Sequence, residues 1–274
     1  MLWVLALVAA LVLAFFGGAR TALRIAQNDD AAAHAEALAE SGVTLAILSL
    51  SSPTPWTADG SPHDVTFDGG TIVDSVQDEN GKIDLNVAPP ELFIGLFRTL
   101  GAKDDEATGA TTAIVNWRSG QQASDDATAT AATPQQFLDV SELAQIPGIG
   151  RDLYRQAAPF LTVYSFSPYI NPLTAPAEVL KSLPGVDPDS IPSFLASRAG
   201  AAGNLAAVPQ LPGAGDIAVA PVSTVTITAR ARTKAGAQFT RVAVVSLAAG
   251  ADAPFTILAW GTARDVGSPP AETK

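Results

Sequence analysis

The stretch AQIPGIGRDLYRQ, residues 144–156, has the residue types and spacing of a phosphate-binding turn. An apolar residue, Pro-Gly-Ile-Gly and a short run with Arg151 and Arg155 would form a helix-hairpin-helix, which grips nucleic-acid phosphates. The charge opposes this chemistry: the 274 residues carry a formal net charge of −11, and residues 86–200 have a local net charge of −5. Because Lys and Arg supply nonspecific nucleic-acid affinity, we expect no nucleic-acid partner. Gly148 and Gly150 are interpreted as a turn that lets two helices cross closely.

Three carboxylates in TIVDSVQDENGKIDLN, residues 71–86, are candidate calcium ligands: Asp78, Glu79 and Asp84. Their spacing misses the calcium-loop pattern Asp-x-Asn-x-Asn-Gly. The β-branched residues on both sides of Asn80-Gly81 instead predict a tight β-hairpin. We therefore interpret the three carboxylates as solvated turn residues.

The chain contains few of the side chains that most often act in catalysis. There is no cysteine, and His34 and His63 are the two histidines. No Gly-x-Ser-x-Gly elbow, metal-binding His pair or phosphate loop is present. We assign no catalytic or cofactor-binding residue and predict that the protein is not an enzyme. An enzyme that depends on carboxylates is the alternative.

The elements that would position these residues begin with MLWVLALVAALVLAFFGGA, residues 1–19, which has no charged residue. Its length as a helix matches the hydrocarbon core of a bilayer. This predicts a retained membrane helix rather than a cleaved signal peptide, because no basic region precedes the apolar run. The amphipathic pattern from Arg20 to Leu50 extends it to one helix of about fifty residues.

Residues 86–200 are predicted to be short helices joined by Pro-Gly turns. IDLNVAPPELF, residues 83–93, returns as INPLTAPAEVL, residues 170–180. In each copy a proline, Pro89 or Pro176, is placed at the first helical position, and Glu91 or Glu178 follows near the positive helix end. FLDVSELAQIPGIG adds a capping box of Asp139 and Glu142.

The C-terminal part, from Ser223 to Arg264, predicts three strands of an antiparallel meander: alternation at 224–229, then 239–247 and 255–260. The last residues, GSPPAETK, predict a disordered tail. The predicted organisation is a transmembrane part at 1–19, helix and first strands at 20–86, a helical insertion at 87–215, closing strands at 216–265 and the tail at 266–274.

These parts resemble a type IV pilin-like subunit enlarged by an insertion, an α+β fold with a long N-terminal helix on an antiparallel sheet. The chain resembles the K-type minor pseudopilin of the bacterial type II secretion system, the GspK family, through LWVLALVAALV, DENGKIDLNVAPPEL, AIVNW, FLDVSELAQIPGI, INPLTAPAEVLKSLPG and PFTILAW. The predicted fold class thus includes an inserted α-helical domain with helix-hairpin-helix or SAM-like turns.

The resemblance implies a non-enzymatic subunit at the tip of the periplasmic pseudopilus, with I-type and J-type minor pseudopilins as partners. It implies a single-pass inner-membrane anchor in contact with lipid and the secretion platform, a periplasmic head, and contact with secreted cargo or the outer-membrane channel. It also implies a basic leader before Met1, which would hold the N-terminus in the cytoplasm. A membrane-anchored helix-hairpin-helix DNA-uptake protein is the alternative function.

Calcium is a candidate cofactor by the resemblance, because some family members have carboxylate-rich calcium sites in the head. In this chain Arg118, Ser119 and Gly120 follow Trp117, where an acidic run is common in the family. Asp125 and Asp126 come later, in a predicted flexible loop. The sequence therefore names no metal ligands.

Overall fold

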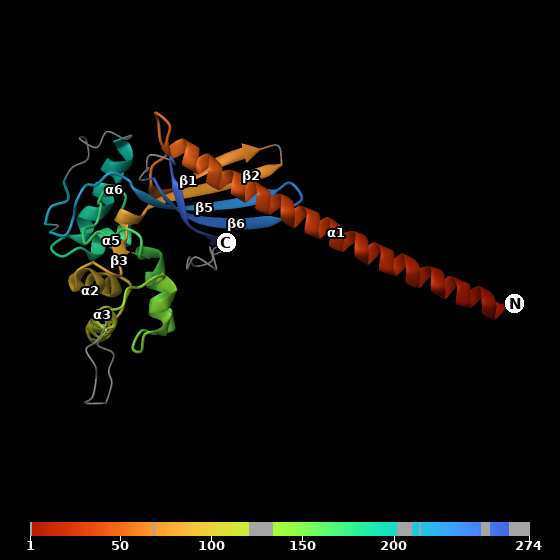
Figure 1. Cartoon of the computed structure of the whole chain (residues 1–274), viewed down its shortest axis with the longest axis horizontal. Helices are drawn as coiled ribbons and strands as arrows, with labels where there is room; N and C mark the ends of the chain where they lie inside the picture. Colours follow the sequence, from red (N-terminus) through yellow and green to blue (C-terminus); the bar gives the residue numbers. More distant parts are fainter. Residues whose placement is uncertain are drawn as a thin grey trace.

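The computed structural model describes residues 2–67, 69–120, 134–201, 210–213, 215–247 and 253–262, without the side chains of residues 5 and 9–20. The first helix, α1, spans Leu2–Leu50 without a proline, which corresponds to about 74 Å. It leaves the head as a rod whose N-terminus lies far from the rest of the chain (Figure 1). The prediction of a single helix of about fifty residues is confirmed.

The end of α1 packs on a sheet through one face of small residues. Ala35, Ala39, Val43 and Ala46 are at most 1 % exposed, and their spacing of three and four positions lines one side of a helix. Residues 21–30 are exposed throughout. The rod therefore docks only by its last turns.

The sheet is antiparallel, in the order β1-β2-β5-β6-β7. Its strands are β1 (Asp59–Phe67), β2 (Gly70–Asp78), β5 (Thr224–Thr233), β6 (Gln238–Ser246) and β7 (Thr256–Thr262). The predicted C-terminal meander is confirmed, and β2 joins it through β5. A core of Ile72, Val76, Val225, Ile227 and Val245 faces α1, as β-strand alternation requires.

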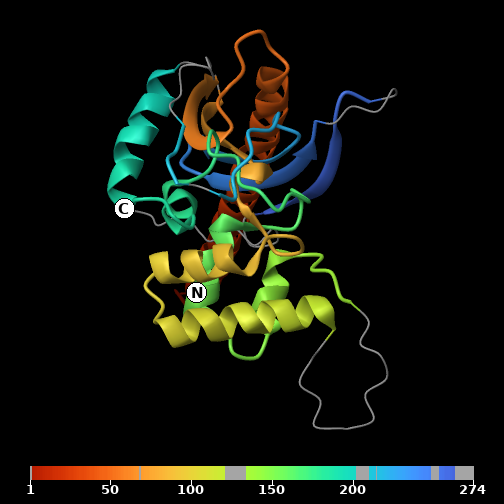
Figure 2. The same ribbon diagram turned by 90° about the vertical axis from the view of Figure 1, so that its left-hand side faces the viewer.

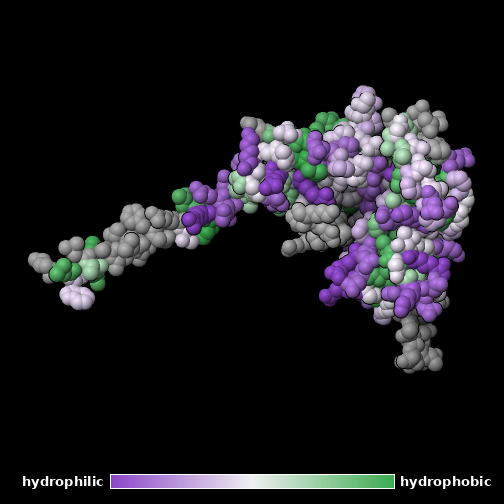
Figure 3. All heavy atoms as spheres, turned by 180° about the vertical axis from the view of Figure 1, so that it is seen from behind, coloured by the Kyte–Doolittle hydropathy of each residue, from purple (hydrophilic) through white to green (hydrophobic). Residues whose placement is uncertain are grey.

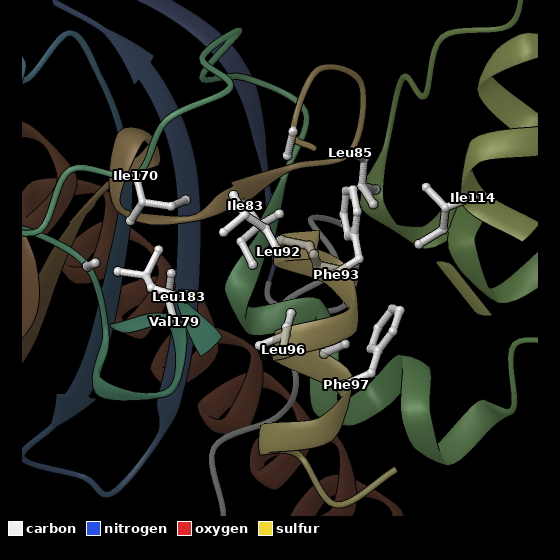
Figure 4. Packing of buried hydrophobic residues seen from close by; sticks show 14 of the residues in the cluster. Ile83, Leu85, Leu92, Phe93, Leu96, Phe97, Ile114, Ile170, Val179 and Leu183 are labelled. Carbon is white, nitrogen blue, oxygen red and sulfur yellow. The ribbon is translucent and has the colours of Figure 1, made fainter. Parts of the chain in front are cut away.

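The chain between β2 and β5 forms a second hydrophobic core. Its helices lie beyond the end of the sheet that is farthest from the N-terminus of α1 (Figure 1), and α2 and α3 run side by side (Figure 2). Leu92, Phe93, Leu96 and Phe97 of α2 are fully buried at its centre (Figure 4). The elements are α2 (Pro90–Thr99), α3 (Asp104–Ser119), α4 (Arg151–Ala157), α5 (Ala177–Ser182), α6 (Ile191–Gly200), β3 (Ile83–Asp84), β4 (Leu161–Thr162) and the 3-10 turns η1 (Glu79–Gly81), η2 (Val140–Gln145), η3 (Ala158–Phe160) and η4 (Pro188–Ser190).

The predicted hairpin at Asn80-Gly81 is wrong. β2 ends in η1, and β3 pairs in parallel with β4 rather than folding back on β2. Gly81 is required for a different reason: a Cβ there would lie 2.8 Å from the backbone carbonyl atoms of Thr174. The chain turns inward at this point because a distant segment packs against it.

Helix starts are close to the prediction. Pro89 and Pro176 are N-caps rather than first helical residues, and Glu91 and Glu178 lie in the first turns as predicted. The capping box of Asp139 and Glu142 is confirmed, but it opens a 3-10 turn.

The described residues contain no helix that is both long enough and apolar enough to cross a membrane. Most side chains of the predicted span, residues 1–19, lie outside the described residues. The predicted tail, residues 266–274, and the Asp125–Asp126 loop are also outside them.

Candidate functional site

The strongest concentration of buried charge lies where β2 leaves the sheet. Asp78, Glu79 and Asp84 are at most 1 % exposed, and the Lys82 side chain is 12 % exposed. We call these four residues the junction cluster. The prediction that the three carboxylates are solvated is wrong, because η1 and the following strand β3 place them in the interface between the sheet and the helical region.

Asp78 joins this turn to the segment INPLTAPAEVL, residues 170–180. Its Oδ1 accepts the Asn80 backbone N–H at 3.1 Å and caps η1. Its Oδ2 accepts hydrogen bonds from Asn171 Nδ2 at 3.1 Å and Thr174 Oγ1 at 2.9 Å. Burial raises the pKa of Asp78, and these hydrogen bonds oppose the shift. The carboxyl thus fixes residues more than ninety positions away.

Glu79 joins the turn to two strands. Oε1 accepts hydrogen bonds from Lys82 Nζ at 2.7 Å and Thr226 Oγ1 of β5 at 2.6 Å. Oε2 accepts the hydroxyl of Thr162 on β4. Thr226 belongs to the five-stranded sheet and Thr162 belongs to the inserted region. Glu79 therefore holds the sheet against the inserted region.

Asp84 orders the loop after β4. Its Oδ2 accepts Ser165 Oγ at 3.0 Å and the Phe166 N–H at 2.9 Å, and Oδ1 accepts the Asn86 N–H at 2.8 Å. Phe166 has φ 51, a left-handed conformation that a non-glycine residue adopts only with support. The Asp84 carboxylate supplies that support.

The junction cluster does not fit a metal site. All six carboxylate oxygens already accept hydrogen bonds from the protein. Among the described residues, no group of three or more His, Cys, Asp or Glu side chains is arranged to hold a metal ion. The cluster therefore acts as a structural connection, and calcium has no ligand set in this part of the chain.

A second charged group holds the rod on the sheet. Arg241 of β6 is 7 % exposed; its Nη2 donates to Glu40 Oε1 of α1 at 2.9 Å and also to Glu36. The guanidinium lies over the rings of Phe239 and Trp260, 4.9 and 5.2 Å from their centroids. One arginine thus ties two turns of α1 to the strands.

Asp74 lies beside this contact without a partner of its own. It is 0 % exposed, and neither side-chain oxygen has a hydrogen-bond partner. A Cβ on Gly42 of α1 would be 2.6 Å from Asp74 Oδ1, so the helix passes directly over the carboxyl. Burial raises the pKa of Asp74 to about 7.

The predicted helix-hairpin-helix segment takes a different form. The element before its turn is η2, a 3-10 turn, and α4 has only seven residues. Gly148 has φ 95, which fits a permissive turn. A Cβ on Gly148 or Gly150 would meet no atom within 4 Å, so the predicted close crossing of two helices is wrong. Arg155 is exposed and pairs with Asp152. A helix of seven residues in which Arg155 is already paired with Asp152 gives phosphates little to bind.

The two histidines make different contacts. His34 is exposed on the rod, 4.0 Å from Asp30. His63 of β1 stacks on Trp56 with ring centroids 4.4 Å apart. Neither belongs to a catalytic group in the described residues.

A protruding N-terminal helix packed on an antiparallel sheet, with a helical region between its strands, defines an elongated α+β class of protein. Residues 73–166 match the family model described as Type II secretion system (T2SS), protein K. Over 89 % of this chain and 98 % of the other, the fold is similar to a chain in the crystal structure of the GspK-GspI-GspJ complex from the enterotoxigenic Escherichia coli Type 2 Secretion System, with 16 % identity and a TM-score of 0.52. The comparison with curated proteins gives no match. The predicted resemblance to a K-type minor pseudopilin is therefore confirmed.

Sequence reasoning missed Arg241, Asp74 and Gly42. Asp74 had a usable signal, because it shares the β-strand alternation of Ile72 and Val76 and so should face the core. Arg241 had none, since its partners Glu36 and Glu40 are about two hundred residues away.

Proposed function

We propose that this protein is a non-enzymatic minor pseudopilin that caps the tip of the type II secretion pseudopilus. The match of residues 73–166 to protein K carries the proposal. In this role the chain is a pilin-like subunit, residues 1–19 anchor it in the inner membrane, and the head lies in the periplasm. Partners of the I and J types are supported by the composition of the structurally similar complex.

The shape of α1 supports assembly through the rod. Leu23 and Ile25 are 60 and 55 % exposed, where the rod is clear of its own head. Hydrophilic side chains gather on the rod where it leaves the head (Figure 3). Exposed apolar residues on a single projecting helix are suited to packing against similar helices of neighbouring subunits.

The place of the inserted region supports capping. We assign residues 87–215 to an inserted domain, because they contribute most of a core that is separate from the core under α1. Its helices extend past the end of the sheet opposite to the N-terminus of the rod (Figure 1). A subunit stacked along the rod axis above this head would meet the insertion.

The test is secretion in cells that lack the chromosomal copy. The full chain should restore secretion, and a variant with residues 87–215 replaced by a short Gly/Ser linker should insert but fail to restore it. The linker variant must be present in membranes at the level of the full chain. Normal secretion with this variant would refute the capping role of the insertion.

A further inference from the structure

β7 forms one edge of the sheet and carries three exposed apolar side chains. Ile257, Leu258 and Trp260 are 46, 46 and 44 % exposed. In the described part of the chain, the strand order leaves the outer side of β7 without a neighbouring strand. Such an edge presents backbone N–H and C=O groups to any extended chain.

The opposite edge of the sheet is protected against strand addition. β1 contains Pro62 and the exposed Asp64, and its register shifts between Asp59 and Pro62. Proline and charge both blunt an edge. β7 has the sequence TILAWGT, with neither proline nor charge, although its pairing with β6 also shifts register once, between Val244 and Val245. One edge of this sheet is closed, and the other is suited to pairing.

We propose that β7 is a docking edge on which an extended strand of another pilin-like subunit is added to the sheet. The inference rests on the proposed function, which supplies such neighbours. Backbone hydrogen bonds would give the contact its strength, and the side chains on either side would give it selectivity.

A second copy of this chain is the wrong occupant. Antiparallel pairing of two β7 strands about a two-fold axis reverses strand direction between the copies. Because α1 runs lengthwise over the strands (Figure 1), the two rods would then point in opposite directions. Rods anchored in one membrane and packed in one bundle point the same way, so the added strand comes from a different subunit.

The apolar side chains define the surface that the added strand meets. Ile257 and Trp260 pair in register with Val245 and Ala243, whose side chains belong to the core under α1. Residues directly opposite in an antiparallel pair share a face. The register of β7 shifts at Leu258, between these two residues, so both Ile257 and Trp260 lie on the face that α1 covers, beside the rod.

The charge beside them specifies the partner further. Glu36 and Glu40 both contact Arg241, and their side chains remain 48 and 46 % exposed. Two carboxylates and one guanidinium leave a local charge of −1. The fitting partner is a strand with apolar residues along β7 and a Lys or Arg directed toward these two glutamates.

The chain lacks cysteine, so a single introduced thiol reports on one site. Leu258→Cys is labelled with a benzophenone maleimide in membranes that contain co-expressed I-type and J-type subunits of the same bacterium. Thr66→Cys on the protected edge β1 is the matched control. We expect a cross-link from Leu258→Cys to the I-type or J-type subunit and none from Thr66→Cys. In a second pair, Ile257→Lys should reduce co-purified partner about tenfold, and Thr66→Lys should not.

The failures are distinguishable. Co-purification of the subunits without a cross-link at Leu258, equal cross-links from both edges, or a cross-link only to a second copy overturns the β7 assignment and leaves the proposed function standing. Absence of co-purification with the unaltered chain overturns both.

Discussion

The buried carboxyl of Asp74 makes the docking of α1 depend on pH. Burial raises the pKa of Asp74 in the folded protein to about 7, from the ordinary aspartate value of 3.8. Because the folded protein holds the proton more tightly than the unfolded chain, the carboxyl costs nothing at pH values below both pKa values. As pH rises from about 4 to 7, the unfolded chain loses its proton first, and the folded state is progressively destabilised.

The size of the effect follows from the shift. A pKa difference of about 3 units corresponds to about 4 kcal/mol of lost stability above pH 7. At pH 5 part of that loss is already present. Between pH 5 and pH 8 the Asp74 carboxyl should therefore remove about 2–3 kcal/mol from the free energy of unfolding.

The assay compares the full chain with Asp74→Asn, which keeps the side-chain shape but cannot ionise. Urea unfolding in detergent at pH 5 and pH 8 gives the free energy of unfolding for each. The difference between the two proteins should change by about 2–3 kcal/mol in favour of Asp74→Asn at pH 8.

The exposed Asp64→Asn on β1 is the control for general charge effects, and its curves should parallel those of the unaltered chain. If the curves for Asp74→Asn and the unaltered chain are parallel from pH 5 to pH 8, Asp74 is not held neutral by burial.

Two further predictions concern the inserted region. Glu79→Ala leaves the Lys82 ammonium buried without its carboxylate, so we expect a loss of about 3–5 kcal/mol in urea unfolding; a loss under about 1 kcal/mol would contradict a closed junction. Gly95→Ala places a Cβ 2.0 Å from the Ser182 carbonyl oxygen, which should separate α2 from α5 at a cost of about 1–3 kcal/mol and increase amide exchange in those helices before the sheet. Gly109→Ala on α3, with no atom within 4 Å, should leave exchange unchanged, and equal effects of the two alanines would refute the close-contact reasoning.

Elements with a local cause could be predicted from the sequence. The length of α1 follows from uninterrupted helical periodicity, and the β5–β7 meander follows from alternation with short turns. The Asn80-Gly81 signal failed because it describes only its neighbours. Asn171 and Thr174, which bond Asp78 at this turn, are 93 and 96 positions away in the sequence. No local sequence pattern predicts these contacts.

At the candidate site, the family resemblance was predicted correctly and the burial of the individual side chains was not. DENGKIDLN was correctly associated with the K-type family, while its acidic residues were assigned to solvent. Runs of turn-forming polar residues usually face water, and the local sequence therefore favoured exposed carboxylates. What decides otherwise is pairing: each of these carboxylates finds donors from another part of the chain, and such donors compensate its burial.

The junction cluster explains how two separate cores form one head. Apolar contact alone is non-directional, so it would let the helical region rock on the end of the sheet. Asp78 and Glu79 instead fix distances to Asn171, Thr162 and Thr226, which lie on three different segments. Buried polar groups of this kind add little net stability but penalise every arrangement that leaves one unpaired. The proposed capping role would require this property, because blocking the next subunit depends on a fixed angle between the inserted region and the rod.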